Sequence, residues 1–388
     1  MTDRARTPVN PRLAQGAVLG AVVGLTWAAA LRAWMSQLAG AATTSTWTTV
    51  LLVLLPGAAV GALLRLAGAR RSMGLRHRRA LVWAPVLFAT ALLDPAIFRL
   101  LITTGEGSGA LMVVATALTG GVVLSRGRWT FGRILCAVVW SMGMLLLFFI
   151  GTMPAPLSTP LGAWVCLFGG SLMAVLSFGA ALPHPHGIRG GDALLPWVGA
   201  VTGLAWASGL RGFMSEVIGD ESAVSWIGTF GFVLVPGTAI GALLGWAELQ
   251  RRRGRPRRFL VWSPVLFAAV LVPGLADPAT LFEGGVGGGA IGVPLISVIG
   301  AYAVAGRRQV VRRAGAVVFI AALAVWVLTA TTVGGQDFAL DTPYGVWTTA
   351  LYYGLLVTAA LATSIPLRAQ PQTRPRDGSA RIVATSAR

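Results

Sequence analysis

The sequence predicts an all-α integral membrane protein of about twelve transmembrane helices, arranged as two tandem, parallel six-helix repeats. The composition is the first reason: 55% of the 388 residues are hydrophobic and only 11% are charged, with a mean hydropathy of +0.73, whereas soluble domains carry roughly 25% charged residues. The second reason is that the apolar residues form long runs between short arginine clusters, as repeated bilayer crossings require. The third is an internal duplication.

The duplication is visible without gaps. The segment Gly20–Ser36 (GAVVGLTWAAALRAWMS) matches Gly199–Ser215 (GAVTGLAWASGLRGFMS) at more than half of its positions. Further matches follow in the same order, pairing PGAAVGALL with PGTAIGALL, RRALVWAPVLFA with RRFLVWSPVLFA, and STPLGAW with DTPYGVW. A repeat this long resembles the halves of a transporter more than a solenoid. The sequence therefore predicts a first repeat at 14–182, a cytoplasmic linker at 183–192 and a second repeat at 193–366.

Each repeat contains six apolar stretches, and about 20 apolar residues suffice to span a bilayer as a helix. In the first repeat the expected spans are 14–38, 47–67, 80–103, 110–125, 132–152 and 160–182. In the second they are 193–217, 226–247, 259–282, 287–305, 312–334 and 344–366. An Asp-Pro step at Asp94, and again at Asp277, interrupts the third span. Because a residue before proline disfavours helix, the outer end of that span is expected to be a separate short helix.

Glycines at four-residue spacing recur in the first two spans of each repeat. Examples are Gly20 and Gly24 in the first span and Gly57 and Gly61 in the second. Small residues at this spacing let helices approach closely in lipid, so these spans are expected to lie inside the bundle against neighbouring helices.

The basic residues predict the orientation. All 31 are arginines, and with twelve spans every interhelical cluster lies on the same side as the amino-terminal tail. Since arginine resists translocation, this side is expected to be cytoplasmic. Residues 1–13 are then a cytoplasmic basic tail, and residues 367–388 a disordered cytoplasmic tail of a protein of the cell membrane. Arginine without lysine also indicates a GC-rich, bacterial genome.

The net charge of +18 raises the question of partners. Because the arginines flank apolar spans, the expected partners are the lipid bilayer and the anionic lipid headgroups at the cytoplasmic face, and no nucleic acid is expected. The two cysteines, Cys136 and Cys166, lie inside spans, and the three histidines lie in loops. The sequence therefore predicts no catalytic set, no metal site and no cofactor.

Four ionisable residues in the spans are candidates for binding a substrate or ion: Arg32, its counterpart Arg211, Asp94 and its counterpart Asp277. Charges in membrane spans are costly, so each needs an explanation. Three interpretations remain open. In the first, the arginines reach the outer headgroups and the aspartates cap or kink a helix end. In the second, an arginine and an aspartate form a pair within each repeat. In the third, the arginines hold an anion and the aspartates exchange a proton.

Three functions remain open as well. Two parallel six-span halves favour a secondary transporter of a small solute, an anion included, with its site between the repeats. A non-transporting membrane scaffold or envelope protein and a membrane-embedded enzyme are the alternatives. The six-plus-six organisation resembles that of the major facilitator superfamily. The loop after the second span departs from that family's motif, because Arg65 and Gly245 stand where the family has aspartate, so the sequence assigns no family.

Overall fold

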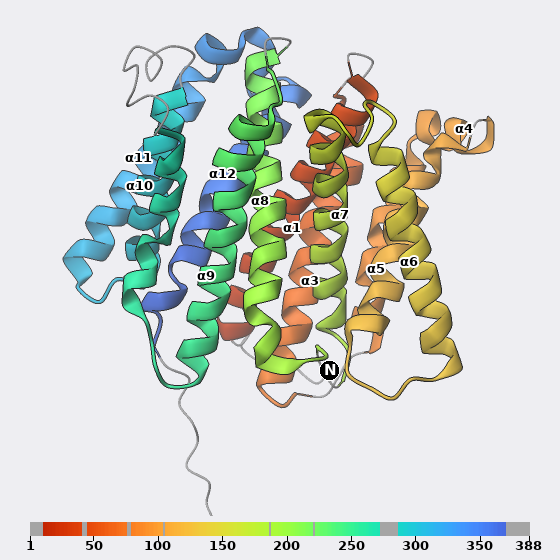
Figure 1. Ribbon diagram of the computed structural model, residues 1–388, viewed down its shortest axis with the longest axis horizontal. Coiled ribbons are helices and arrows are strands. Elements are labelled where there is room, and N and C mark those ends of the chain that lie inside the picture. Colours follow the sequence, from red (N-terminus) through yellow and green to blue (C-terminus); the bar gives the residue numbers. More distant parts are fainter. Residues whose placement is uncertain are drawn as a thin grey trace, which may run out of the picture.

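The computed structural model describes residues 11–40, 45–75, 79–103, 105–185, 188–219, 222–271 and 286–369. Long helices run side by side in one bundle (Figure 1), and no strand occurs within these ranges. The first half of the chain forms α1 (Pro11–Ala39), α2 (Trp47–Thr49), η2 (Val50–Leu54), α3 (Leu55–Ser72), η3 (Arg79–Leu93), α4 (Pro95–Thr103), η4 (Glu106–Ser108), α5 (Gly109–Leu124), α6 (Phe131–Gly151) and α7 (Pro160–Ala181). The second half forms η5 (Gly191–Leu194), α8 (Leu195–Ile218), η7 (Trp226–Leu234), α9 (Val235–Arg252), η8 (Arg258–Leu271), α10 (Val286–Ala305), α11 (Gln309–Gly334), η12 (Gln336–Phe338), α12 (Pro343–Thr363) and η13 (Ile365–Leu367).

A helix overlaps each of the twelve predicted ranges, but their lengths differ. Among the described residues, eight helices are long and apolar enough to cross a membrane. A ninth candidate is a pair of helices, Ala80–Leu93 and Pro95–Thr103, bent by 92°. Gly109–Leu124, Arg258–Ala269 and Ile291–Ala305 are apolar but shorter. The chain is thus a multi-pass α-helical membrane protein, and its described residues contain eight candidate spans, or nine with the bent pair, by length and composition.

The bend in the third span lies where the sequence predicts it. Asp94 separates η3 from α4, and its carboxylate Oδ1 accepts a hydrogen bond of 2.9 Å from the backbone N–H of Ala96. This bond satisfies one of the free N–H groups at the start of α4, as an N-terminal cap does. The second predicted break, at Asp277, lies outside the described residues.

Helices α6 and α11 lie toward opposite sides of the bundle (Figure 1) and expose large apolar side chains. Phe149 is 64% exposed on α6, and Leu328 is 77% exposed on α11. Contiguous apolar surface of this kind is costly in water and favourable against lipid tails. These faces are therefore suited to contact with the hydrocarbon of a bilayer.

The predicted glycine contacts are confirmed between α1 and α3. A Cβ atom added to Gly24 would collide with the carbonyl oxygen of Gly57, and one added to Gly20 would collide with that of Gly61. The same contact recurs between α8 and α9, where a Cβ on Gly203 would collide with the carbonyl oxygen of Gly237. Only glycine permits backbones to approach this closely, so each pair packs as one rigid unit.

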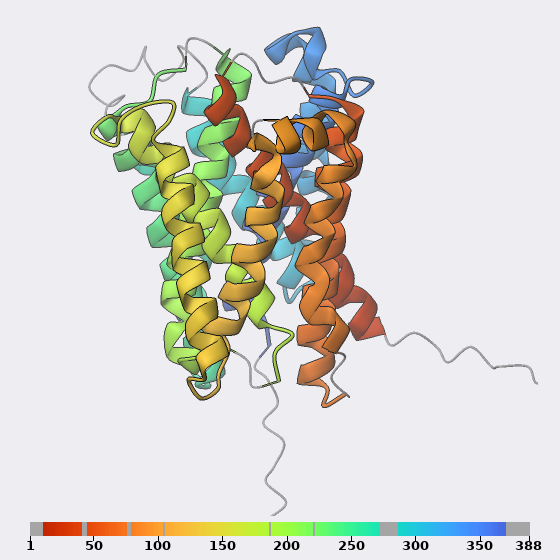
Figure 2. The same ribbon diagram turned by 90° about the vertical axis from the view of Figure 1, so that its right-hand side faces the viewer.

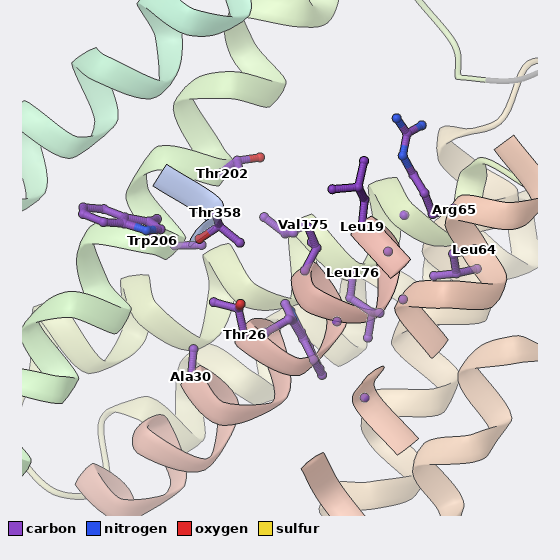
Figure 3. A pocket seen from close by; sticks show the side chains of 18 of the residues that line it. Leu19, Thr26, Ala30, Leu64, Arg65, Val175, Leu176, Thr202, Trp206 and Thr358 are labelled. Atoms are coloured by element: carbon purple, nitrogen blue, oxygen red, sulfur yellow. The ribbon is translucent and has the colours of Figure 1, made fainter. Parts of the chain in front are cut away.

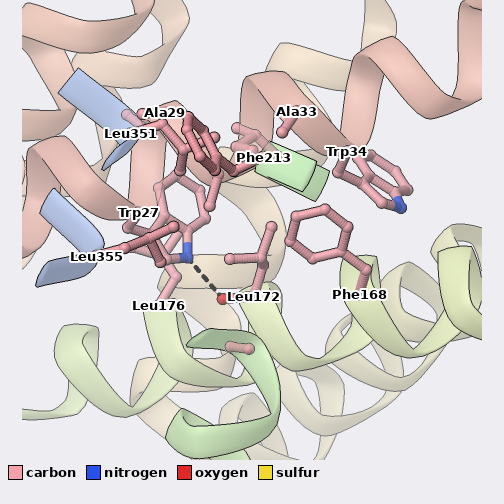
Figure 4. Packing of buried hydrophobic residues seen from close by; sticks show 14 of the residues in the cluster. Trp27, Ala29, Ala33, Trp34, Phe168, Leu172, Leu176, Phe213, Leu351 and Leu355 are labelled. Atoms are coloured by element: carbon pink, nitrogen blue, oxygen red, sulfur yellow. Dashed lines mark hydrogen bonds between the residues drawn. The ribbon is translucent and has the colours of Figure 1, made fainter. Parts of the chain in front are cut away.

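Tryptophan side chains join the first long helix of each half to the last. The indole N–H of Trp27 on α1 donates to the carbonyl oxygen of Leu172 on α7 at 2.8 Å (Figure 4). The indole N–H of Trp206 on α8 donates to that of Leu355 on α12 at 2.9 Å. Around them the buried core runs without interruption from α1 and α7 to α8 and α12. The two halves therefore share one apolar core.

Helices α1 and α8 touch at matching positions of the internal duplication. A Cβ atom on Gly209 would lie 3.4 Å from the Cβ of Ala30, and one on Gly212 would lie 3.3 Å from the Cβ of Ala33. In the alignment of Gly20–Ser36 with Gly199–Ser215, Ala30 corresponds to Gly209 and Ala33 to Gly212. The two helices therefore meet at residues that the sequence match pairs with each other.

Arginine-bearing loops meet at one end of the bundle, which we call the arginine-rich end. Arg252 forms an ion pair of 2.6 Å with Asp192, and Arg251 donates to the carbonyl oxygen of Ala369 at 2.9 Å. Helix α1 begins and α12 ends at this end (Figure 2). The loops that follow α1 and α8 lie at the opposite end.

Candidate functional site

Arg32 lies near the opposite end of α1, and its side chain is buried, with 4% of its surface exposed. Its Nη2 donates to the Oγ of Ser45 in the following loop at 3.2 Å. Its guanidinium carbon lies 4.8 Å from the ring centroid of Trp347 on α12. A cation over the face of a tryptophan is attracted by the ring's negative π surface, so this contact holds α1 against α12.

Arg211 on α8 is equally buried, with 4% of its surface exposed. Its Nε donates to Thr229 Oγ1 at 3.3 Å, within the π-helical segment η7. Its Nη1 donates to the hydroxyls of Ser215 at 2.6 Å and Ser222 at 2.9 Å, and its Nη2 to the carbonyl oxygen of Ala223 at 2.9 Å. The protein itself therefore satisfies most of this guanidinium's donors.

Arg211 also stacks on the other half of the chain. Its guanidinium carbon lies 5.2 Å from the ring centroid of Trp164 on α7. Trp164 and Trp347 are corresponding residues in the matched segments STPLGAW and DTPYGVW. Each arginine thus stacks on the tryptophan of the opposite half, so the two contacts together hold the halves together near one end of the bundle.

The two tryptophans differ in one respect. The indole N–H of Trp347 donates to the carbonyl oxygen of Ala29 at 3.0 Å. The indole N–H of Trp164 is buried and has no acceptor in the described part of the chain. Leaving a buried donor without a partner costs roughly 1–3 kcal/mol. The two contacts are therefore similar in geometry and unequal in stability.

Two residues beside Arg32 were missed by the sequence analysis. The hydroxyl of Tyr344 donates to Glu216 Oε2 at 2.8 Å, and the Glu216 carboxylate interacts electrostatically with the Arg32 guanidinium. In the duplication, Glu216 corresponds to Gln37 and Tyr344 to Leu161. The signal that could have revealed them is this pair of simultaneous departures from the repeat.

The candidate aspartates are not part of this cluster. Asp94 caps α4 and hydrogen-bonds the side chain of Thr48, and no ion pair joins it to Arg32. Asp277 lies outside the described residues. The structure therefore brings Arg32 and Arg211 to the contact between the halves and leaves Asp94 apart from them.

A cavity of about 410 Å³ lies between the two halves, on the arginine-rich side of the arginine–tryptophan contacts. Figure 3 shows its walls, which come from α1, α3 and α7 of the first half and from α8 and α12 of the second. Ala30 is among the lining residues, and Arg32 follows it half a turn later on α1. The cavity thus stops just before the layer that holds Arg32.

The walls are mainly apolar, although three threonines line them. Thr26, Thr202 and Thr358 donate their hydroxyl protons to carbonyl oxygens of their own helices, at 2.8, 2.7 and 2.6 Å. The indole N–H groups of Trp27 and Trp206 are likewise bonded to backbone carbonyls. The interior of the cavity therefore offers a guest apolar contact and few hydrogen-bond donors.

Charged donors lie at the arginine-rich end of the cavity, where the exposed Arg65 and Arg368 form part of its lining. The Nε and Nη2 of Arg368 already donate to the Ser364 hydroxyl and the carbonyl oxygen of Leu361, so its Nη1 and the Arg65 guanidinium are the groups that can contact a guest. Partial burial lowers the pKa of Arg368; the Glu248 carboxylate opposes this, and the charges of Arg251 and Arg65 lower it further. Two like charges near each other repel, so an anion between Arg65 and Arg368 would be stabilised by both.

Within the described ranges, no three histidine, cysteine, aspartate or glutamate side chains come close enough together to hold a metal ion. No protein-family model, curated protein or solved structure matches this chain. Its function has to be inferred from the cavity and from the contacts around it.

Proposed function

We propose that this chain is a secondary transporter of small organic anions with an apolar body. The observation that carries the proposal is the cavity between the halves, which reaches the exposed Arg65 and Arg368 at one end and stops at the Arg32 layer at the other. Ligand sites are typically concave and apolar with a few polar groups that fix orientation. The apolar body of such an anion would fill the cavity, and its acidic group would contact Arg65 and Arg368.

We further propose that residues 14–182 and 193–366 are two parallel six-helix repeats and that all twelve expected spans cross the cell membrane. Supporting this are the matched segments of the sequence and the contacts of Ala30 with Gly209 and of Ala33 with Gly212. Parallel repeats with a site at their interface are an architecture of secondary transporters. Both termini would lie in the cytoplasm, and a cysteine label at Arg253 would be accessible only from that side.

The arginine–tryptophan contacts fit the closed end of such a transporter. The Arg32–Trp347 and Arg211–Trp164 contacts both join opposite halves. Movement of one half against the other would break both contacts and open the cavity on that side, as alternating access requires. Most donors of Arg211 are bonded to protein groups, so its proposed role is to hold this closed state and not to bind the anion.

Transport tests the proposal directly. The full chain is reconstituted into liposomes, and uptake of octanesulfonate, a permanently anionic amphiphile, is measured against protein-free liposomes. We expect saturable uptake that is abolished by Thr358→Trp, which fills the cavity. The matched control, Thr332→Trp, places the same bulk at an exposed position of α11 and should retain uptake. Uptake by the wild type no faster than through lipid alone, or full uptake by Thr358→Trp, would contradict the proposal.

A further inference from the structure

A second cavity, of about 400 Å³, lies away from the contact between the halves, at the arginine-rich end. Helices η8 and α10, the turn that follows α10, and the start of α11 form its walls. Arg258, Arg307 and Arg308 line it together with Trp262, Phe259 and Tyr302. We call this cavity the η8–α11 groove. It shares no lining residue with the central cavity.

The charge of the groove is uncompensated. Within the described part of the chain, the side chains of Arg258, Arg307 and Arg308 form no hydrogen bond and no ion pair, and no acidic residue lines the groove. Three guanidinium groups around one cavity repel each other unless an anion lies among them. The α-helix α11 also begins here, at Gln309, and the positive end of its dipole adds to the same field.

The corresponding loop of the first half shows that this arrangement is not a requirement of the fold. In the loop between α5 and α6, Arg126 donates to the carbonyl oxygen of Ile188 at 3.0 Å. Arg133, in the first turn of α6, donates to the Ser125 hydroxyl at 2.8 Å and the Gly127 carbonyl oxygen at 3.0 Å. Those arginines hold their loop through internal bonds. The arginines of the η8–α11 groove have no such role, so they are available to an external ligand.

The surroundings of the groove indicate what that ligand is. Phe259 is 61% exposed and Trp262 is 53% exposed at its edge, and Val310 at the start of α11 is 78% exposed. Tryptophan beside arginine at the end of an apolar helix is typical of the headgroup level of a bilayer. A ligand here would place an acidic group among the arginines and its apolar part against the lipid-facing side of α11.

We propose that the η8–α11 groove binds the phosphate headgroup of an anionic phospholipid. Guanidinium groups bind phosphate oxygens through paired, charge-assisted hydrogen bonds. Basic pockets between transmembrane helices near the membrane surface are suited to such headgroups. This site does not depend on the transport proposal, because its residues lie outside the central cavity.

Native mass spectrometry of the full chain, purified in detergent and titrated with phosphatidylglycerol, tests the proposal. We expect one tightly bound phosphatidylglycerol, little phosphatidylcholine, and a loss of affinity of at least about tenfold in Arg307→Gln/Arg308→Gln. Arg253→Gln/Arg255→Gln, which removes the same charge from the neighbouring exposed loop, should bind like the wild type. Unchanged binding in the groove variant, or equal loss in the control, would overturn the assignment.

A second measurement does not depend on removing arginines. Phosphatidylglycerol with brominated acyl chains quenches nearby tryptophans, and the part of the quenching that disappears in Trp262→Phe reports on the groove. The quenching assigned to Trp262 should saturate as brominated phosphatidylglycerol is added and should be absent with brominated phosphatidylcholine. Glycerol phosphate added in solution should fail to compete; effective competition would show a site for free phosphate compounds instead. Quenching that is unaffected by Trp262→Phe would contradict the proposal.

Discussion

The guanidinium of Arg32 lies 4.8 Å from the ring centroid of Trp347, and the indole N–H of Trp347 in turn donates to the carbonyl oxygen of Ala29, one turn earlier on α1. Helix α12 is thereby attached to α1 through both the face and the edge of one side chain. Arg211 and Trp164 form the matching face contact between α8 and α7, without the edge bond.

This difference predicts unequal effects of two equivalent substitutions. Trp347→Phe removes a buried hydrogen bond and should lower the free energy of unfolding more than Trp164→Phe, by about 1 kcal/mol. Both variants lose a similar area of aromatic contact, so each is the other's control. Equilibrium unfolding in mixed detergent micelles measures the difference. Equal losses would show that the bond to Ala29 contributes nothing.

The Tyr344–Glu216 hydrogen bond, at 2.8 Å, should appear as coupling between the two residues. In a double-mutant cycle of Tyr344→Phe and Glu216→Gln, we expect a coupling energy of about 1–2 kcal/mol in the free energy of unfolding. Tyr353, whose hydroxyl donates to the carbonyl oxygen of Leu323 at 2.6 Å, supplies the control. Tyr353→Phe should be additive with Glu216→Gln. Additivity in the first cycle would contradict the pairing.

Arg211 is predicted to be a structural residue. Arg211→Gln leaves hydroxyls and a carbonyl oxygen without their donors and should lower the free energy of unfolding by at least about 3 kcal/mol, since hydrogen bonds to charged groups contribute roughly 1.5–3 kcal/mol each. The matched change Arg313→Gln, at an exposed position of α11, should have little effect. The thermal midpoints of the purified variants provide the comparison, and similar midpoints would refute this role.

The glycine contacts predict opposite outcomes for two Gly→Ala changes in helices. Gly24→Ala would drive a methyl group into the carbonyl oxygen of Gly57, so we expect a loss of about 1–3 kcal/mol in stability from the forced separation of α1 and α3. Gly170→Ala meets no atom within 4 Å and should be neutral or stabilising by up to about 1 kcal/mol. Unfolding in mixed micelles measures both changes. A harmless Gly24→Ala would contradict the close packing.

Much of this architecture could be predicted because its determinants are local. Apolar length predicts the helices, the Asp94-Pro95 step predicts the bend before α4, and glycine spacing predicts that α1 and α3 pack closely against neighbouring helices. The 3₁₀ conformation of η3 and the π-helical conformation of η7 could not be predicted, because hydropathy shows where a segment is apolar and not which hydrogen-bond pattern its backbone adopts.

The arginine–tryptophan contacts could not be predicted for a different reason. The duplication identifies Arg32 with Arg211 and Trp164 with Trp347, but it does not reveal that each arginine meets the tryptophan of the other half. That choice depends on how α1, α7, α8 and α12 pack together. Glu216 and Tyr344 were missed because the candidates were chosen among residues that occur in both copies, and each of these two occurs in one copy only.

Transport as proposed requires the two halves to move against each other, and a reversible cross-link between α1 and α8 tests this requirement most directly. Ala30→Cys/Gly209→Cys, with Cys136 and Cys166 replaced by alanine, brings two cysteines to positions whose Cβ atoms are 3.4 Å apart, close to the spacing a disulfide requires. In liposomes, oxidation should stop octanesulfonate uptake and reduction should restore it, while each single-cysteine variant is unaffected by either treatment. Full uptake through the oxidised, cross-linked protein would contradict the claim.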